Sequence, residues 1–379
     1  MRRAHPIALA GATAVLISTL TACGDDAAKG TGGASTIAVT ATDSSCAIAK
    51  KSVAAGAATF KVTNNGSRPT ELEILKADGK VVSERENIGP GTAAELTVQL
   101  AAGTYKVLCS PGMTGKGPSQ VIVVSGSSGG GRADLSLEQA VAGYRGYVKD
   151  QVDDTLAKTR TFAAAVKAGD VARAKKLYAP SRVGWERIEP VAESFGDIDP
   201  KVDLREADLE QGQTWTGWHR LEKALWKAGS VKGQQQYAGR LVADLEALQQ
   251  RVGGAEITPT SMSNGAKELL DEVATGKITG EEEAYSHTDL VDFAANVDGA
   301  EKVYRLLEPV VRQRDAALAG TIDDEFAKVK RLLATYKDGA GDGGYVSYDT
   351  VGEAKRKELS DAVNALGEPL SRLAGVVAR

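Results

Sequence analysis

A run of seven small residues, Ser125–Gly131, separates two parts of the chain whose apolar residues follow different periods. Before this run, short segments alternate apolar and polar residues, as half-buried strands do. After it, apolar residues recur at i, i+3 and i+4, as in amphipathic helices. A chain of 379 residues is also long for a single hydrophobic core. We therefore predict an all-β domain over residues 36–124 and an all-α domain over residues 134–379, joined by a flexible linker over residues 125–133.

The predicted strands are short and are bounded by turn residues. They run over Thr36–Thr40, Ala58–Thr63, Glu71–Leu75, Glu95–Leu100, Thr104–Leu108 and Gln120–Val124. Between them stand turn signals such as Asn64-Asn65-Gly66 and Gly89-Pro90-Gly91. Short strands at this spacing predict a β-sandwich.

The predicted helices fill the rest of the chain. They run over Leu135–Lys167, Val171–Tyr178, Ser181–Ser194, Trp215–Ala228, Gln234–Arg251, Ala266–Ala274, Leu290–Ala319, Ile322–Tyr336 and Gly352–Val377. Asp170 and Ser181 stand where N-caps belong, and Pro190 is expected to kink the third of these helices. This number of helices predicts one large bundle or two four-helix bundles packed together.

The N-terminus has the features of a lipoprotein export signal. Arg2 and Arg3 precede an apolar run, Ile7–Leu20, that is too short to cross a bilayer as a mature helix. The run ends in Leu20-Thr-Ala-Cys23, which resembles a bacterial lipobox. We expect residues 1–22 to be a signal peptide, Cys23 to carry lipid, and residues 23–35 to tether the protein to the outer face of the cytoplasmic membrane. That compartment also permits disulfides.

Histidine is scarce, because the chain has three and His5 lies in the expected signal peptide. The net charge of −4 supplies no basic field for nucleic acid. His219 and Glu222 stand three residues apart in Thr216–Trp226, so on a helix they share one face. An imidazole and a carboxylate in this relation can bind one metal ion or form an ordinary surface pair, and the spacing alone leaves both interpretations open.

Two further segments place acidic residues near this motif. Glu186, Glu189 and Glu193 fall on one helix face, where their mutual repulsion favours a bound cation unless the face is solvated. Glu281–Glu283 lie close in sequence to His287, the other histidine of the mature chain. This third segment is either part of a metal site or a solvated acidic loop.

Three longer motifs resemble those of the imelysin-like family: Tyr178–Glu193, Thr216–Trp226 and Tyr285–Leu290. With its β domain in front, the chain resembles Efe-type iron-uptake lipoproteins over about residues 36–379, both domains in order. The resemblance implies a cupredoxin-like domain, two four-helix bundles and a metal site at the H-x-x-E helix. It implies iron capture rather than enzymatic turnover, with an iron permease and a haem peroxidase as partners.

The resemblance also implies a set of metal ligands in the helical domain. These are His219, Glu222, Glu186, Glu189, Asp203 and Glu282. Asp199 is the alternative to Asp203, and the register within Glu281–Glu283 is open. One imidazole with several carboxylates is a hard ligand set, which suits Fe³⁺ or Fe²⁺, although zinc can bind such a set in vitro.

Two other functions remain as alternatives. An imelysin-type metallopeptidase would need a second histidine, since zinc peptidases take two from one helix, and Lys223 follows Glu222 here. A protein that binds acidic polysaccharide through a bridging cation would need exposed aromatic residues. Trp185, Trp215 and Trp218 lie near the motif and keep that alternative open.

The β domain contains no histidine, which excludes a blue-copper site of two histidines and a cysteine. It nevertheless resembles a cupredoxin-like domain, and the resemblance implies a metal site of Cys46, Cys109 and Glu71, with Glu73 and Met113 as weaker candidates. Cysteine and methionine would favour copper, and the carboxylates would admit iron. The alternative is a Cys46–Cys109 disulfide. Oxidation of Fe²⁺ in this domain is a hypothesis.

Overall fold

The computed structural model describes residues 35–126, 135–339 and 344–379, and within them every side chain except that of Glu193. The expected signal peptide, the lipidation of Cys23, nearly all of the tether and residues 127–133 of the expected linker lie outside this range. Within it, every helix is too short or too polar to span a membrane.

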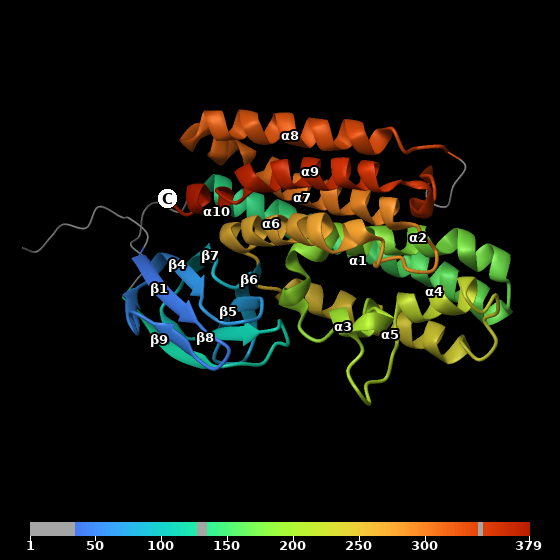
Figure 1. Ribbon diagram of the computed structural model, residues 1–379, viewed down its shortest axis with the longest axis horizontal. Helices are drawn as coiled ribbons and strands as arrows, with labels where there is room; N and C mark the ends of the chain where they lie inside the picture. The colour runs from blue at the N-terminus through green and yellow to red at the C-terminus, as the bar shows by residue number, and fades with distance from the viewer. Residues whose placement is uncertain (1–34, 127–134, 340–343) are drawn as a thin grey trace, which may run out of the picture. The chain divides into compact units, whose positions relative to one another are not determined.

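Two sheets form the N-terminal part of the described chain (Figure 1). In order across the first sheet lie β2 (Cys46–Ile48), β1 (Ser35–Ala41), β4 (Gly56–Asn64) and β7 (Ala93–Leu100). In order across the second lie β3 (Ser52–Ala54), β9 (Ser119–Ser125), β8 (Gly103–Pro111), β5 (Thr70–Lys76) and β6 (Val81–Ile88). β1 runs parallel to β4 and β3 parallel to β9, and the other pairs are antiparallel. The predicted β domain is confirmed, and each of the six predicted strands lies within an observed one.

The three strands that the sequence pattern did not predict are all edge strands: β2, β3 and β6. β2 and β3 have three residues each, too few for an alternating pattern. β6 reads Val-Val-Ser-Glu-Arg-Glu-Asn-Ile, with a charged centre. A strand that pairs on one side only is under weaker pressure to be apolar, so its sequence carries a weaker signal.

A disulfide joins the two sheets through the core of the sandwich. Cys46 lies on β2 of the first sheet and Cys109 on β8 of the second, with 5.5 Å between their Cα atoms. Both are buried among apolar side chains such as Phe60 and Ile122. In this bonded state neither sulfur is a thiolate that can bind a metal.

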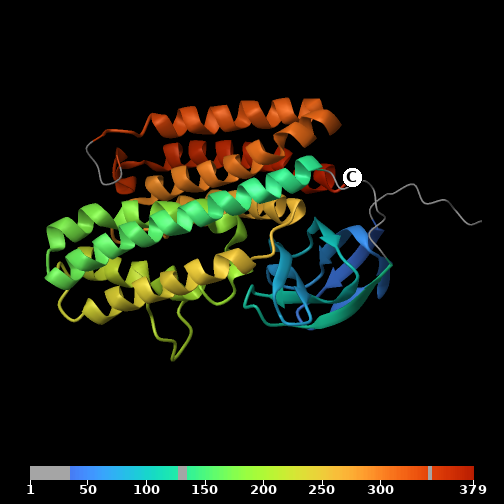
Figure 2. The same cartoon turned by 180° about the vertical axis from the view of Figure 1, so that it is seen from behind.

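The helices form two sets of four (Figures 1 and 2). The first set is α1 (Leu135–Ala168), α2 (Val171–Ile188), α4 (Trp218–Trp226) and α5 (Gln235–Arg251). The second is α6 (Pro259–Thr275), α7 (Asp289–Arg314), α8 (Ala316–Ala334) and α9 (Glu353–Leu370), followed by the short α10 (Leu373–Val377). α1 and α2 also pack on α7, so both sets share one hydrophobic core. This arrangement agrees with the predicted pair of four-helix bundles.

Several predicted helix boundaries are wrong: α6 begins at Pro259 rather than Ala266, α8 begins at Ala316 rather than Ile322, and the helix predicted over Gly352–Val377 is divided into α9 and α10. Two more boundaries differ for a reason that the side chains show. α2 continues through Pro180 to Ile188, and Ser181 is no N-cap, because its hydroxyl donates back to the Tyr178 carbonyl at 2.6 Å. The helix predicted to continue to Ala319 ends earlier, at Arg314, and the side chain of the following Asp315 caps α8. Both residues can hydrogen-bond the backbone in more than one way, and the surrounding packing selects which one forms.

Two other local predictions hold. Asp170 caps α2 by accepting the N–H of Arg173 at 3.0 Å. Near Pro190 the α-helix gives way to the 3₁₀ segment η1 (Glu189–Phe195), with a non-helical residue at Val191. α2 therefore ends at Ile188, two residues after Glu186, whose carboxylate lies in the interior cluster described below.

Helix α6 also contacts the sandwich. Arg85 on β6 pairs with Glu268 at 2.6 Å and with Asp271 at 3.0 Å, and the amide of Asn264 donates to the Ser83 hydroxyl at 2.9 Å. These polar contacts connect the two domains through one helix.

Candidate metal centre

The start of α4 is held against the end of α3 (Asp199–Val202) by a residue that has to be glycine. Gly217 has a φ of +86°, and a Cβ on it would lie 2.3 Å from the Val202 carbonyl oxygen. The hydroxyl of Thr216 donates to the Lys201 carbonyl at 2.7 Å. Because His219 lies in the first turn of α4 and Asp203 directly follows α3, this contact brings the two side chains together.

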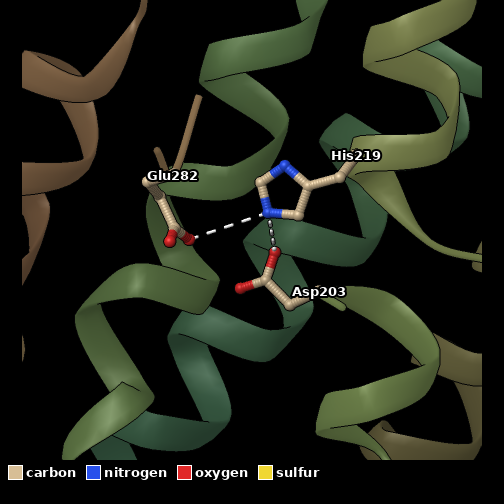
Figure 3. A group of neighbouring side chains, drawn as sticks. All are labelled: Asp203, His219 and Glu282. Carbon is tan, nitrogen blue, oxygen red and sulfur yellow. Dashed lines mark ion pairs between the residues drawn. The ribbon is translucent and has the colours of Figure 1, made fainter. Parts of the chain in front are cut away.

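The imidazole of His219 presents its Nε2 atom to two carboxylates. Nε2 lies 3.3 Å from Asp203 Oδ1 and 3.6 Å from Glu282 Oε1, and both carboxylates point toward it (Figure 3). His219 is 2% exposed, and Nε2 makes no hydrogen bond to the described residues. Three ligand atoms, one on each of these residues, lie within 4.8 Å of one another, which is close enough to hold one ion.

Glu222 occupies the opposite side of the imidazole ring. Its Oε2 lies 3.3 Å from His219 Nδ1, and its Oε1 accepts the backbone N–H groups of Tyr285 at 2.8 Å and Ser286 at 2.7 Å. This carboxylate is therefore fixed by the loop that precedes α7. A proton on Nδ1 that is donated to Glu222 leaves the lone pair of Nε2 directed at Asp203 and Glu282.

Arg182 on α2 lies fully buried beside these acids. Its guanidinium bonds to Asp203, to Glu186 at 2.5 Å and to Glu282 at 3.3 Å, and its Nε lies 2.8 Å from Glu283. The sequence motif contains Arg182, but nothing in its spacing identified it as part of the site. Its charge fixes Asp203 and Glu282 in place, since a guanidinium offers several donors in a rigid plane.

Lys277, in the 3₁₀ segment η4 (Lys277–Thr279), is a second buried cation that the sequence analysis missed. Its Nζ lies 3.0 Å from Glu186 Oε2 and 2.9 Å from each carboxylate oxygen of Glu189. It is 0% exposed. A single lysine in a polar loop carries no sequence signal of burial, so only the fold could place it here.

Acidic side chains outnumber basic ones inside this cluster. The buried carboxylates are Glu186, Asp203, Glu222, Glu282, Glu283, Asp289 and Asp292. Among the described residues, their buried basic partners are Arg182, Lys277 and His219. Seven acids therefore face three bases even when His219 is protonated. Because a buried carboxylate without a counter-ion is costly, the cluster favours additional positive charge.

Protons supply part of that charge on the α7 side. Burial, reinforced by the charge of Glu222, raises the pKa of Glu283 well above its ordinary value. Burial, reinforced by the charge of Glu186, does the same for the pKa of Asp292, whose two carboxylate oxygens are buried without a hydrogen bond. The raised pKa values favour the protonated forms of these acids, and added positive charge nearby would oppose that shift.

Asp203 and Glu282 behave differently. Burial alone would raise both pKa values, but the charge of Arg182 outweighs it and holds the pKa of Asp203 below its ordinary value. The charge of Lys277, followed by the neighbouring His219, lowers the pKa of Glu282 to about 2. The two carboxylates that face the imidazole are therefore anionic at neutral pH.

The pKa of His219 itself is raised well above its ordinary value. Burial and the charge of Arg182 would lower it, but the carboxylates of Asp203, Glu222 and Glu282 outweigh them. A proton on the ring thus takes the place that a metal cation would fill.

The side of the cluster that carries Asp203 and Glu282 opens to a cavity of 590 Å³, which Glu281 and Arg205 also line. Arg205 Nη1 lies 3.1 Å from Glu281 and 3.5 Å from the outer oxygen of Glu282. An ion that enters through this cavity meets Asp203 and Glu282 before it reaches the imidazole.

The structure separates the other sequence candidates from this group. Asp199 is not among the side chains that could share an ion, and Glu281 faces Arg205 at the cavity. His287 is half-buried with a φ of +58°, and it too lies outside those groups. Glu193 has no described side chain. Of the two histidines expected in the mature chain, His219 is therefore the one at the acidic cluster.

The tryptophans near the motif are structural. Trp185 and Trp218 are 0% exposed, and Trp215 is buried. The indole N–H of Trp185 donates to Asp203 Oδ2 at 2.7 Å, and that of Trp218 donates to Ser181 at 3.1 Å. Buried indoles cannot stack on a sugar, and Trp185 instead fixes the orientation of Asp203.

The β domain brings together a different group from the one that the resemblance implied. Glu71 and Glu73 on β5 lie near Glu84 on β6, with ligand atoms within 4.8 Å of one another. Cys46 and Cys109 are bonded to each other, and Met113 is 41% exposed and lies outside the acidic group. The group is made of carboxylates alone, a ligand type that prefers hard cations to copper.

Comparison with known proteins gives a consistent result. The imelysin family profile matches residues 140–373, and the profile of the cupredoxin-like domain matches residues 9–124. Among curated proteins, the chain is similar to "Iron uptake system component EfeO" of Escherichia coli O157:H7, of Escherichia coli strain K12 and of Shigella flexneri. Each is 40% identical over 348 residues, which cover 90% of this chain and 91% of the relative.

Proposed function

Because the chain belongs to the imelysin family, in the form that carries a cupredoxin-like domain in front, we propose that it is the extracytoplasmic iron-binding component of an Efe-type iron-uptake system. In this proposal the helical domain captures iron at Asp203, His219 and Glu282. The relatives are described as iron-uptake components, which supports the assignment to such a system. The geometry of the cluster supports the proposed iron site.

One observation supports the site most directly: a buried imidazole nitrogen that makes no hydrogen bond to the described residues faces two anionic carboxylates inside a cluster with excess negative charge. Oxygen-rich sets with one imidazole suit iron, and several anionic ligands offset the charge of Fe³⁺ as well as of Fe²⁺. Iron would displace the proton from His219 and enter between Nε2, Asp203 and Glu282.

The residues around this set have supporting roles. Glu222 orients the imidazole, as the outer carboxylate does in carboxylate–histidine–metal groups. Arg182 and Trp185 hold Asp203 from two sides. Arg205 faces Glu282 from the cavity, so its charge lies beside the proposed entry of the ion.

The geometry favours cargo binding over peptide hydrolysis. A zinc peptidase of the H-E-x-x-H type holds its metal with two histidines of one helix. Each candidate group in the described helical domain contains a single imidazole, and its remaining ligands are carboxylates. This ligand set therefore favours the cargo-binding proposal over the imelysin-type peptidase.

The location and partners of the protein extend the proposal. Lipid on Cys23 would hold it at the outer face of the cytoplasmic membrane, and residues 125–133 would act as the linker between its domains. Iron would pass from the helical domain to an EfeU-type iron permease, with an EfeB-type haem peroxidase in the same system. Because the β-domain cysteines are paired, copper and ferrous-iron oxidation there are not part of this proposal.

The test is iron binding by the chain from Gly24 to Arg379, measured by calorimetry with Fe²⁺ under anaerobic conditions and with Fe³⁺ citrate. His219→Ala, Asp203→Asn and Glu282→Gln should each weaken binding by more than about 100-fold, since each removes a ligand rather than an outer partner. His287→Ala is the matched histidine control and should bind as the parent does. Unchanged iron binding in all three variants would refute the site, and peptide hydrolysis lost in His219→Ala would favour the peptidase.

A further inference from the structure

The loop that joins η4 to α7 carries a large part of the candidate metal centre. Glu282, one of the proposed ligands, lies on it. The backbone N–H groups of Tyr285 and Ser286, also on this loop, hold Glu222 beside the imidazole at 2.8 and 2.7 Å. Residues 280–288 form turns and irregular backbone rather than a helix or a strand. Because no regular set of backbone hydrogen bonds fixes such a segment, its conformation depends on contacts with other parts of the fold.

Tyr348 contacts both ends of this loop. It lies in the 3₁₀ segment η6 (Tyr348–Thr350), within the connection between α8 and α9. Its hydroxyl donates to the carbonyl of Ile278 at 2.6 Å, and its backbone N–H donates to the carbonyl of His287 at 2.9 Å. The side chain of His287 takes no part in the second bond. The ring of Tyr348 is buried and packs edge-on against Phe293 of α7, with 5.3 Å between the centroids. One buried residue therefore holds the two points between which the loop runs.

Arg356, near the start of α9, holds the same segment. Its Nη1 donates to the carbonyl of Thr279 at 2.8 Å, and its Nη2 donates to the carbonyl of Tyr348 at 3.1 Å. The guanidinium also lies over the Tyr348 ring, 4.3 Å from its centroid. Because a guanidinium offers its donors in one rigid plane, these contacts fix the loop and the tyrosine relative to each other.

Gly280, at the start of the loop, allows this close packing. Its φ is +85°, and a Cβ on it would lie 3.1 Å from Cδ1 of Tyr348. Glycine adopts this left-handed conformation without steric cost, and it leaves room for the aromatic ring against the backbone. The residue at the start of the loop therefore suits the position of the tyrosine.

We propose that Tyr348 and Arg356 are positioning residues of the metal centre: together they clamp residues 278–287 in the conformation that directs Glu282 at His219 and holds Glu222 in place. With the clamp, the ligand oxygens are arranged before an ion arrives. Without it, ion binding must also order the loop, so the affinity falls by the cost of that ordering. The effect on affinity rests on the proposed iron site, whereas the clamp is a separate claim about the loop.

The test variant is Tyr348→Phe, which removes the hydroxyl but keeps the ring and the backbone N–H. Tyr304→Phe is the matched control. Tyr304 on α7 is also fully buried, and its hydroxyl also donates to a backbone carbonyl, that of Ala319 on α8 at 2.8 Å. Each substitution therefore removes one hydrogen bond from a tyrosine hydroxyl to a backbone carbonyl, but only Tyr348→Phe concerns the loop.

Two measurements separate a positioning role from a purely structural one. The first is calorimetric titration with Fe²⁺ under anaerobic conditions, and the second is hydrogen exchange of the loop amides without metal. Tyr348→Phe should bind Fe²⁺ about three- to tenfold more weakly than the parent, which is the range that one neutral hydrogen bond supports. Exchange of the N–H groups of Tyr285 and Ser286 should also be faster. Tyr304→Phe should leave both quantities within about twofold of the parent.

The inference is overturned if Tyr348→Phe matches Tyr304→Phe in both measurements. A weaker affinity without faster exchange would also overturn it, because the effect would not act through the loop, and so would faster exchange at unchanged affinity. If Tyr348→Phe does not fold, Arg356→Gln, which leaves the tyrosine in place, should give the same pair of changes. If the parent binds no Fe²⁺, the proposed iron site fails, and the exchange measurement decides the clamp by itself: faster exchange supports it and unchanged exchange overturns it.

Discussion

Replacing Glu222 by glutamine tests whether this residue orients His219 or binds the metal. Glutamine keeps the oxygen that accepts the N–H groups of Tyr285 and Ser286 at 2.8 and 2.7 Å. It replaces the oxygen that lies 3.3 Å from His219 Nδ1 with an amide group that can only donate. The imidazole would then adopt the other tautomer, in which Nδ1 accepts a hydrogen bond from the amide and Nε2 carries the proton. Nε2 is the atom that must bind iron.

The expected loss follows from that one hydrogen bond. Bonds to charged groups contribute about 1.5–3 kcal/mol, and a distance of 3.3 Å places this one near the lower end. A loss of about 1.5 kcal/mol corresponds to about a tenfold weaker affinity for iron. Outer-shell substitutions at metal sites typically cost about 10–100-fold, which agrees with this estimate.

The assay is calorimetric titration with Fe²⁺ under anaerobic conditions, beside thermal unfolding without metal. Glu246→Gln, which changes a carboxylate that pairs with Arg160 on the surface, is the control. Glu222→Gln should unfold near the parent temperature, because the backbone contacts remain. An unchanged affinity would show that Glu222 does not orient the ring. A loss as large as that of His219→Ala would show that Glu222 is itself a ligand.

Three further predictions concern pH, a buried charge and the disulfide. Because the pKa of His219 is raised and iron must displace its proton, affinity for Fe²⁺ should rise with pH below that raised pKa, by up to about tenfold per pH unit, and a flat profile in calorimetry would contradict this. Burial raises the pKa of Asp289 to about 6, so the folded state loses stability as pH rises from 4 to 6, by up to about 3 kcal/mol. Asp289→Asn should therefore raise the unfolding temperature at pH 7.5 and not at pH 4, as scanning calorimetry would show. Cys46→Ala/Cys109→Ala opens a bridge across a sequence separation of 63 and should cost up to about 4 kcal/mol in chemical unfolding, with iron affinity within about twofold of the parent unless the cysteines contribute to binding.

The sequence predicted the features that repeat along the chain. Alternation of apolar and polar residues predicted the central strands, and a 3.6-residue period of apolar residues predicted the helices. Both patterns arise because one face of each element is buried, so its apolar residues recur at a fixed spacing. His219 and Glu222 could be paired because three residues bring side chains to one helix face. The family resemblance added Asp203 and Glu282, which lie on loops where no period exists.

The sequence could not show how the interior charges are shared. Arg182 and Lys277 look like ordinary surface cations in the sequence, yet both are fully buried among acids from five segments of the chain: α2, η1, the turn after α3, the loop after η4, and α7. Likewise, the role of Glu222 depends on two backbone N–H groups more than sixty residues away. Such contacts arise from the packing of distant segments and leave no local pattern. The pairing of Cys46 with Cys109 also depends on how two sheets face each other.

The most direct test of the proposed iron site is the position of iron in crystals of the loaded protein, located by anomalous scattering on both sides of the iron absorption edge. The account predicts one peak bonded to His219 Nε2, Asp203 and Glu282, with Glu222 on the far side of the ring and Lys277 still between Glu186 and Glu189. A peak at the Nδ1 side beside Glu222 and Glu283, or a peak in the β domain with the His219 site empty, would contradict it.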